Sequence, residues 1–248
     1  MSLINQFSLK FNIPKVTFEG TTPNVKPVFK HIGDDFVTSP LNQKFGASEL
    51  QLQEELNANP QILALLKSNK IPIKINYEEL ENLKKGHLLD TRVLAAKIYS
   101  SLPPDLKSKV DLPTLQEAAM YHDYGKVLIP LKILKKTSEL TDAERKIIEL
   151  HPVLSYEMLK NKALDEKTLA LIKYHHQVPD GSGYPAITED FDFGLEAQIL
   201  NVADRYSALC EKRSYKDAMS KKEALDIIKQ DVDNGLISRH IYYALSMV

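Results

Sequence analysis

The chain has 248 residues, enough for one large domain, or for one domain of ordinary size with a smaller appendage. Its 32 Lys and Arg against 33 Asp and Glu give a formal net charge of -1, which offers no electrostatic basis for wholesale binding to a nucleic-acid duplex or a membrane surface. The single cysteine excludes an intrachain disulfide framework, no apolar run approaches the ~20 residues that span a bilayer, and the first residues lack a secretory signal, so we expect a cytoplasmic protein.

Residues 1–75 are expected to form a small N-terminal region of mixed or extended structure, because prolines, glycines and short alternating stretches fill its first part. Helical patterning begins near Ala47 and breaks at Ile71-Pro72. It then continues through the chain, with leucine and isoleucine at three- and four-residue spacing. The sequence therefore predicts an all-α domain over residues 76–248, and it assigns no role to residues 1–75.

Capping chemistry supports the helical assignment. The segments Thr141 to Glu144 and Ser220 to Glu223 each place a hydroxyl and a glutamate three residues apart, where the two side chains can satisfy the first backbone N–H groups of a helix. Pro113 suits a first helical turn, because its missing N–H is not needed there. Helices are therefore expected to begin at these three places.

Five of the seven histidines lie on or beside apolar stripes of the predicted helices. They are His87, His122, His151, His175 and His176. His122, for example, extends a stripe that contains Leu115 and Ala119, so it shares the face expected to pack in the core. Asp123 follows it directly, and Asp204 lies among apolar neighbours in the segment ILNVADRYSAL. Imidazoles and carboxylates are thus directed toward the interior.

A single histidine on an apolar face is more often a hydrogen-bonded core residue than a metal ligand, but seven such groups together need a shared partner. Burying one unpaired polar group costs roughly 1–3 kcal/mol, so seven would cost on the order of 10 kcal/mol, against total stabilities of roughly 5–15 kcal/mol. A divalent metal satisfies neutral imidazole nitrogen and carboxylate oxygen together. Five imidazoles and two carboxylates exceed the ligands of one tetrahedral ion, and Asp123 could bridge two ions. The sequence therefore predicts a binuclear centre.

Three motifs in this part of the chain occur in a characteristic order. The first, HDYGKVLIP from His122, is an HD dyad followed by glycine, lysine and Ile-Pro; the second, HHQVPDGSGYP from His175, pairs two histidines with a GYP loop. The third is the VADRYSAL segment around Asp204. Across about residues 76–220 this set resembles the HD-GYP branch of the HD-domain metal-dependent phosphohydrolases.

That resemblance implies an HD-domain helical bundle with two divalent metal ions, usually iron or manganese. The implied ligands are His87, His122, Asp123, His151, His175, His176 and Asp204, with Asp123 as the bridge. The implied activity is hydrolysis of cyclic di-GMP, a bacterial messenger, by a metal-activated water.

The resemblance also implies residues that act on the substrate. Asp123 and Lys126 would be the catalytic residues, because Lys126 would contact a phosphate and offset the charge that builds on it. The implied substrate-binding residues are Lys126, Asp180, Gly183, Tyr184, Pro185 and Arg213. The implied partner is a cyclic dinucleotide or another phosphate ester, without duplex nucleic acid or membrane.

Several positions depart from the family pattern. Gln177 stands where the family commonly has a glutamate after the histidine pair, and Ser207 stands where an aspartate is usual. In members with three metals a glutamate lies one helical turn before the first histidine, and that place is Leu83 here. The nearby Glu79 is out of register for a regular helix, so we expect two metals, and the match is loosest around His87.

Three functional hypotheses remain open at this level. The first is a phosphodiesterase for cyclic di-GMP. The second is a catalytically degenerate domain that binds metal or nucleotide and acts through contacts with a signalling protein, as the changes at Gln177 and Ser207 would allow. The third is an HD phosphohydrolase for another nucleotide or phosphate ester, against which the GYP loop argues.

Overall fold

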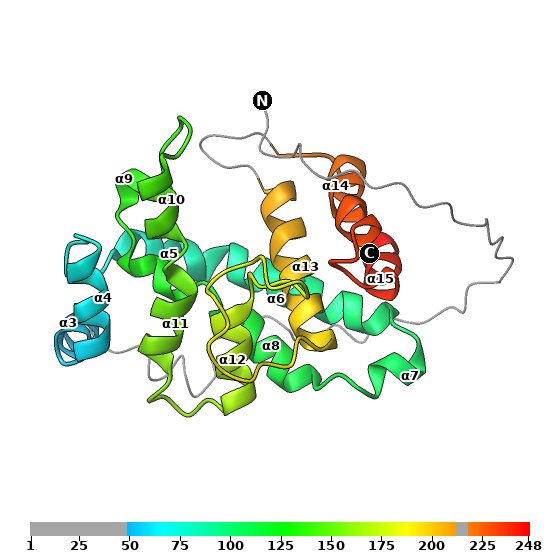
Figure 1. Ribbon diagram of the computed structural model, residues 1–248, viewed down its shortest axis with the longest axis horizontal. Helices are drawn as coiled ribbons and strands as arrows, with labels where there is room; N and C mark the ends of the chain where they lie inside the picture. Colours follow the sequence, from blue (N-terminus) through cyan, green and yellow to red (C-terminus); the bar gives the residue numbers. More distant parts are fainter. Residues whose placement is uncertain (1–48, 212–217) are drawn as a thin grey trace, which may run out of the picture.

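The computed structural model describes residues 49–211 and 218–248, and over these residues it is helical, with one isolated β-bridge (Figure 1). The elements are α3 (Glu49–Asn57), α4 (Pro60–Ser68), α5 (Tyr77–Lys85), α6 (His87–Ser101), α7 (Pro104–Lys107), α8 (Leu112–Tyr121), the 3-10 helix η1 (Tyr124–Leu128), α9 (Leu131–Leu134), α10 (Asp142–Ile148), α11 (His151–Leu159), α12 (Glu166–Tyr174), α13 (Leu195–Cys210), α14 (Lys221–Asp233) and α15 (Arg239–Ser246). The prediction of an all-α domain is confirmed. Within the described ranges, no helix combines the length and the apolar composition needed to cross a membrane.

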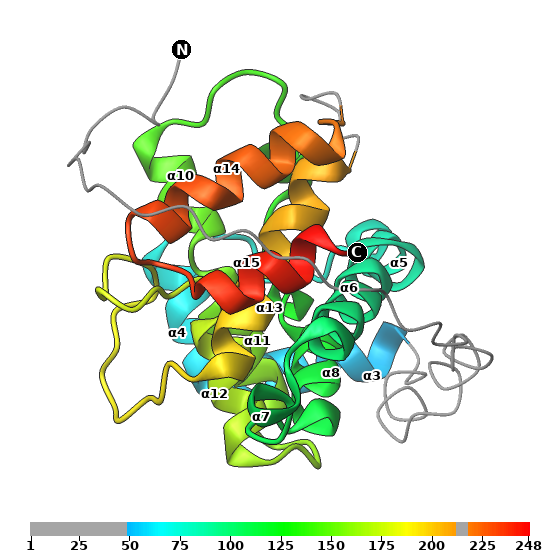
Figure 2. The same cartoon turned by 90° about the vertical axis from the view of Figure 1, so that its right-hand side faces the viewer.

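The centre of the bundle is formed by α6, α8, α11, α12 and α13. Helix α6 packs against α8 and α13, α12 packs against α8 and α11, and η1 lies along α11. Leu115, Ile172 and Leu200 come from three of these helices and are completely buried. Each such side chain contributes about 1.5–3 kcal/mol through burial. Helices α14 and α15, orange and red in Figure 2, cover α13 and α6 from outside.

The predicted helix starts are present. Thr141 and Glu144 form a capping box at α10, and Ser220 and Glu223 form another at α14. Pro113 lies in the first turn of α8. The chain also uses Asn and Asp side chains as N-caps, at α4, α5, α8 and α12. Local capping by side chains therefore fixes where these six helices begin.

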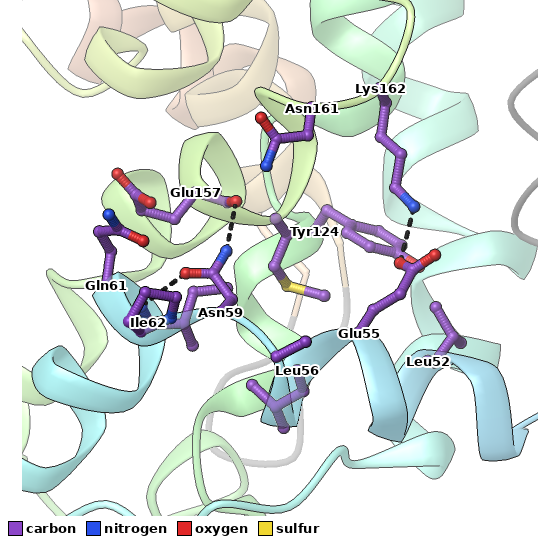
Figure 3. Close-up of a pocket in the computed structure, with 13 residues that line it drawn as sticks. Leu52, Glu55, Leu56, Asn59, Gln61, Ile62, Tyr124, Glu157, Asn161 and Lys162 are labelled. Atoms are coloured by element: carbon purple, nitrogen blue, oxygen red, sulfur yellow. Dashed lines mark hydrogen bonds and ion pairs between the residues drawn. The ribbon is translucent and has the colours of Figure 1, made fainter.

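Helix α4 packs against α11 and α3 packs against α4 (Figure 3), so the helical patterning predicted from near Ala47 is confirmed in the second part of residues 1–75. Asn59 donates a hydrogen bond from Nδ2 to the carbonyl of Glu157 at 3.1 Å, and Lys162 pairs with Glu55 at 2.6 Å. A hollow of about 310 Å³ lies between these helices and reaches Tyr124 of η1. Residues 1–48 lie outside the described residues, and the domain boundary at residue 75 stays a prediction.

Gly125, directly after the HD dyad and one tyrosine, marks the closest approach between η1 and α11. A Cβ added at Gly125 would lie 2.2 Å from the carbonyl oxygen of His151 and 2.5 Å from the backbone nitrogen of Ser155. The backbone N–H of Gly125 donates to Ser155 Oγ at 2.7 Å, and that hydroxyl donates to the carbonyl of His122 at 2.7 Å. Only glycine therefore lets the HD segment lie this close to α11.

We expect Gly125→Ala to lower the stability of the fold. The added methyl would push against backbone atoms that cannot move independently, and overpacking of this kind costs about 1–3 kcal/mol. Thermal unfolding measured by circular dichroism would show a drop in Tm of about 2–4 °C per kcal/mol. Gly194→Ala is the matched control, because its Cβ would meet no backbone atom, only the side-chain carboxylates of Asp192, at 3.3 Å, and Glu196, at 3.6 Å. Equal Tm values for the two variants would contradict the close approach.

Candidate metal centre

The seven predicted ligands come from the ends of helices and from one helix interior. His87 and His151 are the first residues of α6 and α11, whereas His122 and His175 cap the C-terminal ends of α8 and α12. The remaining three are Asp123, His176 and Asp204, of which Asp204 lies inside α13. Helices that are far apart in the sequence thus direct their termini toward one buried point.

The ligand atoms form two groups that share one residue. One group contains Asp123, His151, His175 and His176, and the other contains His87, His122, Asp123 and Asp204; within each group the atoms lie within 4.8 Å of one another. The two oxygens of Asp123 face different groups: Oδ1 lies 3.1 Å from Nε2 of His151, and Oδ2 lies 3.4 Å from Nε2 of His87. This carboxylate therefore has the placement of a bridge between two cations.

Backbone hydrogen bonds fix the tautomer of three imidazoles. The Nδ1 atoms of His122, His151 and His175 lie 2.9, 2.7 and 2.7 Å from the carbonyl oxygen three residues earlier. A carbonyl can only accept, so each Nδ1 carries the proton and, in the neutral ring, each Nε2 presents a lone pair. Metal-ligating histidines usually have this arrangement, because the second nitrogen orients the ring.

The Nε2 lone pairs of these histidines face one another without a hydrogen-bond donor between them, an arrangement that a cation would stabilise. Nε2 of His151 lies 3.2 Å from Nε2 of His175, and neither atom can donate once both protons are on Nδ1. Nε2 of His122 and Oδ1 of Asp123 are also buried without a hydrogen-bond partner in the described part of the chain. Unpaired buried polar atoms cost about 1–3 kcal/mol each. The residues present therefore fit divalent metal ions, which imidazole nitrogen and carboxylate oxygen both ligate.

Burial and neighbouring charges lower the pKa values of three imidazoles and of both carboxylates, which favours the protonation states that bind metal. Burial lowers the pKa of His176 to about 3, and burial together with the neighbouring imidazoles holds the pKa of His175 well below its usual range. Burial by itself would raise the pKa of Asp123, but the Lys126 ammonium and adjacent imidazoles lower it well below the ordinary value. Neutral His175 and His176 therefore face an ionised Asp123 at neutral pH. Burial by itself would lower the pKa of His122, but the carboxylates of Asp123 and Asp204 raise it.

His87, where the sequence match is loosest, is brought into the cluster. Its Nε2 lies 2.9 Å from Oδ1 of Asp204. On the other side of the ring, Nδ1 lies 3.3 Å from Ser207 Oγ and 3.8 Å from a carboxylate oxygen of Glu211. Ser207 lies in the last turn of α13, and Glu211 is the extended residue directly after this helix, so both side chains lie near the same imidazole nitrogen. Sequence reasoning noted the change at Ser207 but missed Glu211, because helical spacing does not describe a residue beyond the end of the helix.

The helix before His87 is interrupted. Helix α5 ends at Lys85 and α6 begins at His87, because Gly86 adopts φ -138° and ψ -101°, outside the helical range. Leu83 is buried in the core. Burial raises the pKa of Glu79, and the charges of Lys126 and Asp123 also act on this carboxyl. A continuous helix would have placed Glu79 on a different face from His87. Because the helix breaks at Gly86, Glu79 lies close enough to Lys126 and Asp123 for their charges to act on it.

The loop after the histidine pair folds back over the cluster. The ring of Tyr184 lies 4.6 Å from the ring of His176, measured between centroids, and the two residues form the isolated β-bridge. Gly183 passes so close that a Cβ would lie 2.2 Å from the carbonyl oxygen of His176. The absence of a side chain at Gly183 thus lets the loop pass directly against His176, with Tyr184 next to the cluster.

The other predicted substrate residues are placed differently. Lys126 in η1 pairs its ammonium with Oδ2 of Asp123 at 2.5 Å, so it lies at the cluster. Asp180 is exposed and accepts hydrogen bonds from Ser182, and the structure does not bring it to the cluster. The carbonyl of Pro185 accepts a hydrogen bond from the side chain of Gln177. Arg213 lies outside the described residues.

Known proteins share these sequence features. The "Cyclic di-GMP phosphodiesterase response regulator RpfG" of Xanthomonas campestris pv. campestris is 36% identical over 121 residues, which are 48% of this chain and 32% of the relative. The "3'3'-cGAMP-specific phosphodiesterase 3" of Vibrio cholerae is 32% identical over 130 residues, which are 52% of this chain and 28% of the relative. The chain therefore spans about a third of the length of these relatives.

A solved structure shows the same fold. An HDG"Y"P protein from Bdellovibrio bacteriovorus superposes with a TM-score of 0.52 at 17% identity, and the match covers 85% of this chain and 65% of that protein. A family model described as "HD domain" matches residues 69–240, more than half of the chain. The predicted HD-domain helical fold is confirmed, and the chain belongs to the HD-domain family.

Proposed function

We propose that this chain is a metal-dependent phosphodiesterase that hydrolyses a cyclic dinucleotide, with cyclic di-GMP as the substrate. The observation that carries the proposal is the pair of ligand groups that share Asp123, since two neighbouring cations suit phosphodiester hydrolysis. The name of the Xanthomonas relative supports the substrate. A cytoplasmic location belongs to the proposal, because the substrate would be an intracellular messenger.

The seven clustered residues would hold two ions, and their nitrogen and oxygen donors, without cysteine, suit iron or manganese. When bound, two divalent cations lower the pKa of water and offset negative charge on the attacking and leaving oxygens. The three rings with their Nδ1 protons on backbone carbonyls remain oriented throughout. No side-chain nucleophile is needed.

Lys126 and Tyr184 would bind and orient the phosphodiester. The ammonium of Lys126 is largely shielded from solvent and lies next to Asp123, so it can hold a phosphate oxygen beside the centre. Burial raises the pKa of the Tyr184 phenol, so this group remains protonated and can donate a hydrogen bond. Its ring also covers His176 and helps to exclude water from that side. Gly183 and Pro185 would shape the same loop.

The structure weakens the case for a degenerate domain. The side chain of Gln177 is engaged with the carbonyl of Pro185, and neither ligand group includes it. Glu211 offers a carboxylate near His87, where Ser207 has replaced the usual aspartate. A second substrate, 3'3'-cGAMP, is favoured by the name of the Vibrio relative. A panel of cyclic dinucleotides compared by kcat/KM would separate the two substrates.

Removal of the metal should lower the thermal stability of the protein. Ligands that bind only the folded state stabilise it by RT ln(1 + [L]/Kd), about 2.7 kcal/mol at one hundred times Kd. Chelator-treated protein should therefore unfold at lower temperature than protein reloaded with Mn²⁺ or Fe²⁺, as measured by differential scanning calorimetry. Identical Tm values at saturating metal would contradict binding at the buried cluster.

Asp123→Asn should abolish both metal binding and hydrolysis. The substitution removes the shared charge, and loss of a direct ligand should exceed the ~10- to 100-fold effect typical of residues that only support a ligand. Metal content by mass spectrometry and hydrolysis of cyclic di-GMP are the two measurements. Asp226→Asn, on the exposed face of α14, is the matched control and should match the parent chain. A variant that retains full metal and activity would overturn the assignment.

Lys126→Ala should separate binding of metal from turnover. Lys126 belongs to neither ligand group, so metal content should stay near that of the parent chain. Loss of a charge-stabilising donor costs roughly 10²- to 10³-fold in rate, and we expect a decrease of that size in kcat/KM. Lys132→Ala, at an exposed lysine of α9, is the control. Unchanged kcat/KM for Lys126→Ala would exclude the phosphate contact.

A further inference from the structure

Gln177 is the residue between the histidine pair and the loop, and its backbone is firmly held. It is completely buried. Its N–H donates to the carbonyl of Tyr174 at 2.8 Å. Its carbonyl accepts from Nδ2 of Asn201 at 3.2 Å, and the same amide donates to the carbonyl of His175 at 3.0 Å. Helix α13 therefore fixes Gln177 in the same frame as the histidines.

The side chain of Gln177 spans the base of the loop. Nε2 donates a hydrogen bond to the carbonyl of Pro185, eight residues later. Oε1 makes no hydrogen bond within the described residues. The amide therefore joins the beginning of the loop to its end, and it acts through its N–H donor alone.

The closed loop places Tyr184 against the centre. The N–H of Tyr184 points at the carbonyl of His176, at a long 3.4 Å, and Gly183 lies against the backbone of His176 and Gln177. The backbone hydrogen bond of Tyr184 is long and therefore weak. The hydrogen bond from Gln177 to the next residue, Pro185, would then set where the tyrosine ring lies. Displacing Pro185 would move the ring off His176 without moving the histidine.

Only a donor suits this position. A carbonyl oxygen accepts hydrogen bonds, so an ionised carboxylate at residue 177 would place two acceptors against each other, and an apolar side chain would leave the carbonyl without its partner. The amide thus makes a contact that an ionised glutamate, the residue common in the family at this place, cannot make.

We propose that Gln177 is a positioning residue: its side-chain amide holds the loop of residues 178–185 closed, so that Tyr184 stays over His176 at the substrate side of the centre. The consequence for substrate rests on the proposed phosphodiesterase function. The effect on the loop does not, because the hydrogen bond exists in the protein without substrate.

The test compares Gln177→Met, which keeps the volume but removes the donor, with Gln177→Glu, which replaces the donor by a carboxylate. Hydrogen exchange of the peptide covering residues 178–185, measured on metal-loaded protein without substrate, should quicken about tenfold or more in both variants. Metal content should stay at the level of the parent chain. With cyclic di-GMP, KM should rise about tenfold while kcat changes less, since orientation and binding are lost rather than the metal chemistry.

Gln230→Met and Gln230→Glu, at an exposed position of α14, are the matched controls and should change neither exchange nor KM. Unchanged loop exchange in Gln177→Met would overturn the proposal, as would loss of metal with an unaltered loop, because the residue would then support the ligands instead. Gln177→Met also decides the matter if Gln177→Glu does not fold. If the parent chain hydrolyses no cyclic dinucleotide while exchange still depends on Gln177, the proposed function fails and the loop tie stands.

Discussion

The structure depends on one buried charge, the carboxylate of Asp123, among imidazoles that cannot donate to one another. Backbone carbonyls accept hydrogen bonds from the Nδ1–H groups of three histidines, so the Nε2 lone pairs of these rings converge. Without cations this arrangement would carry several unpaired polar groups in the core. With the proposed cations the same atoms would be ligands, and the two oxygens of Asp123 face both groups. The five central helices therefore enclose a buried group of lone pairs and carboxylate oxygens that suits bound cations.

Much of the fold and of the site could be predicted from the sequence, because both depend on local signals. Capping boxes and leucine spacing indicated the helices, and histidines on apolar stripes indicated buried ligands. The order of the motifs then indicated the family. His151 and His176 are examples: neither is near Asp123 in the sequence, yet the structure brings all three together, and their role as ligands stays a prediction.

What the sequence could not supply depends on long-range geometry or on a break in periodicity. The prediction placed Glu79 away from His87 by assuming one continuous helix. The non-helical backbone at Gly86 interrupts that helix, so the assumed register does not apply. Glu211 lies near His87 only because α13 crosses the start of α6. The partner of Gln177 is eight residues away, across a loop whose path no periodic pattern describes. Asp180 accepts hydrogen bonds from Ser182 within its own loop, a local contact that no periodic pattern describes, and its role at the substrate stays a prediction.

The placement of ligands at helix ends has a consequence for how the chain responds to its surroundings. His87 and His151 begin helices, whereas His122 and His175 end them, so one small volume joins four termini. With the proposed metals bound, the binding free energy would be shared by every helix that ends there, and global stability would become a function of the free metal concentration. Scarcity of metal would then shorten the lifetime of the polypeptide as well as lower its activity. The metal-free bundle would unfold more often, and proteases cleave the unfolded segments.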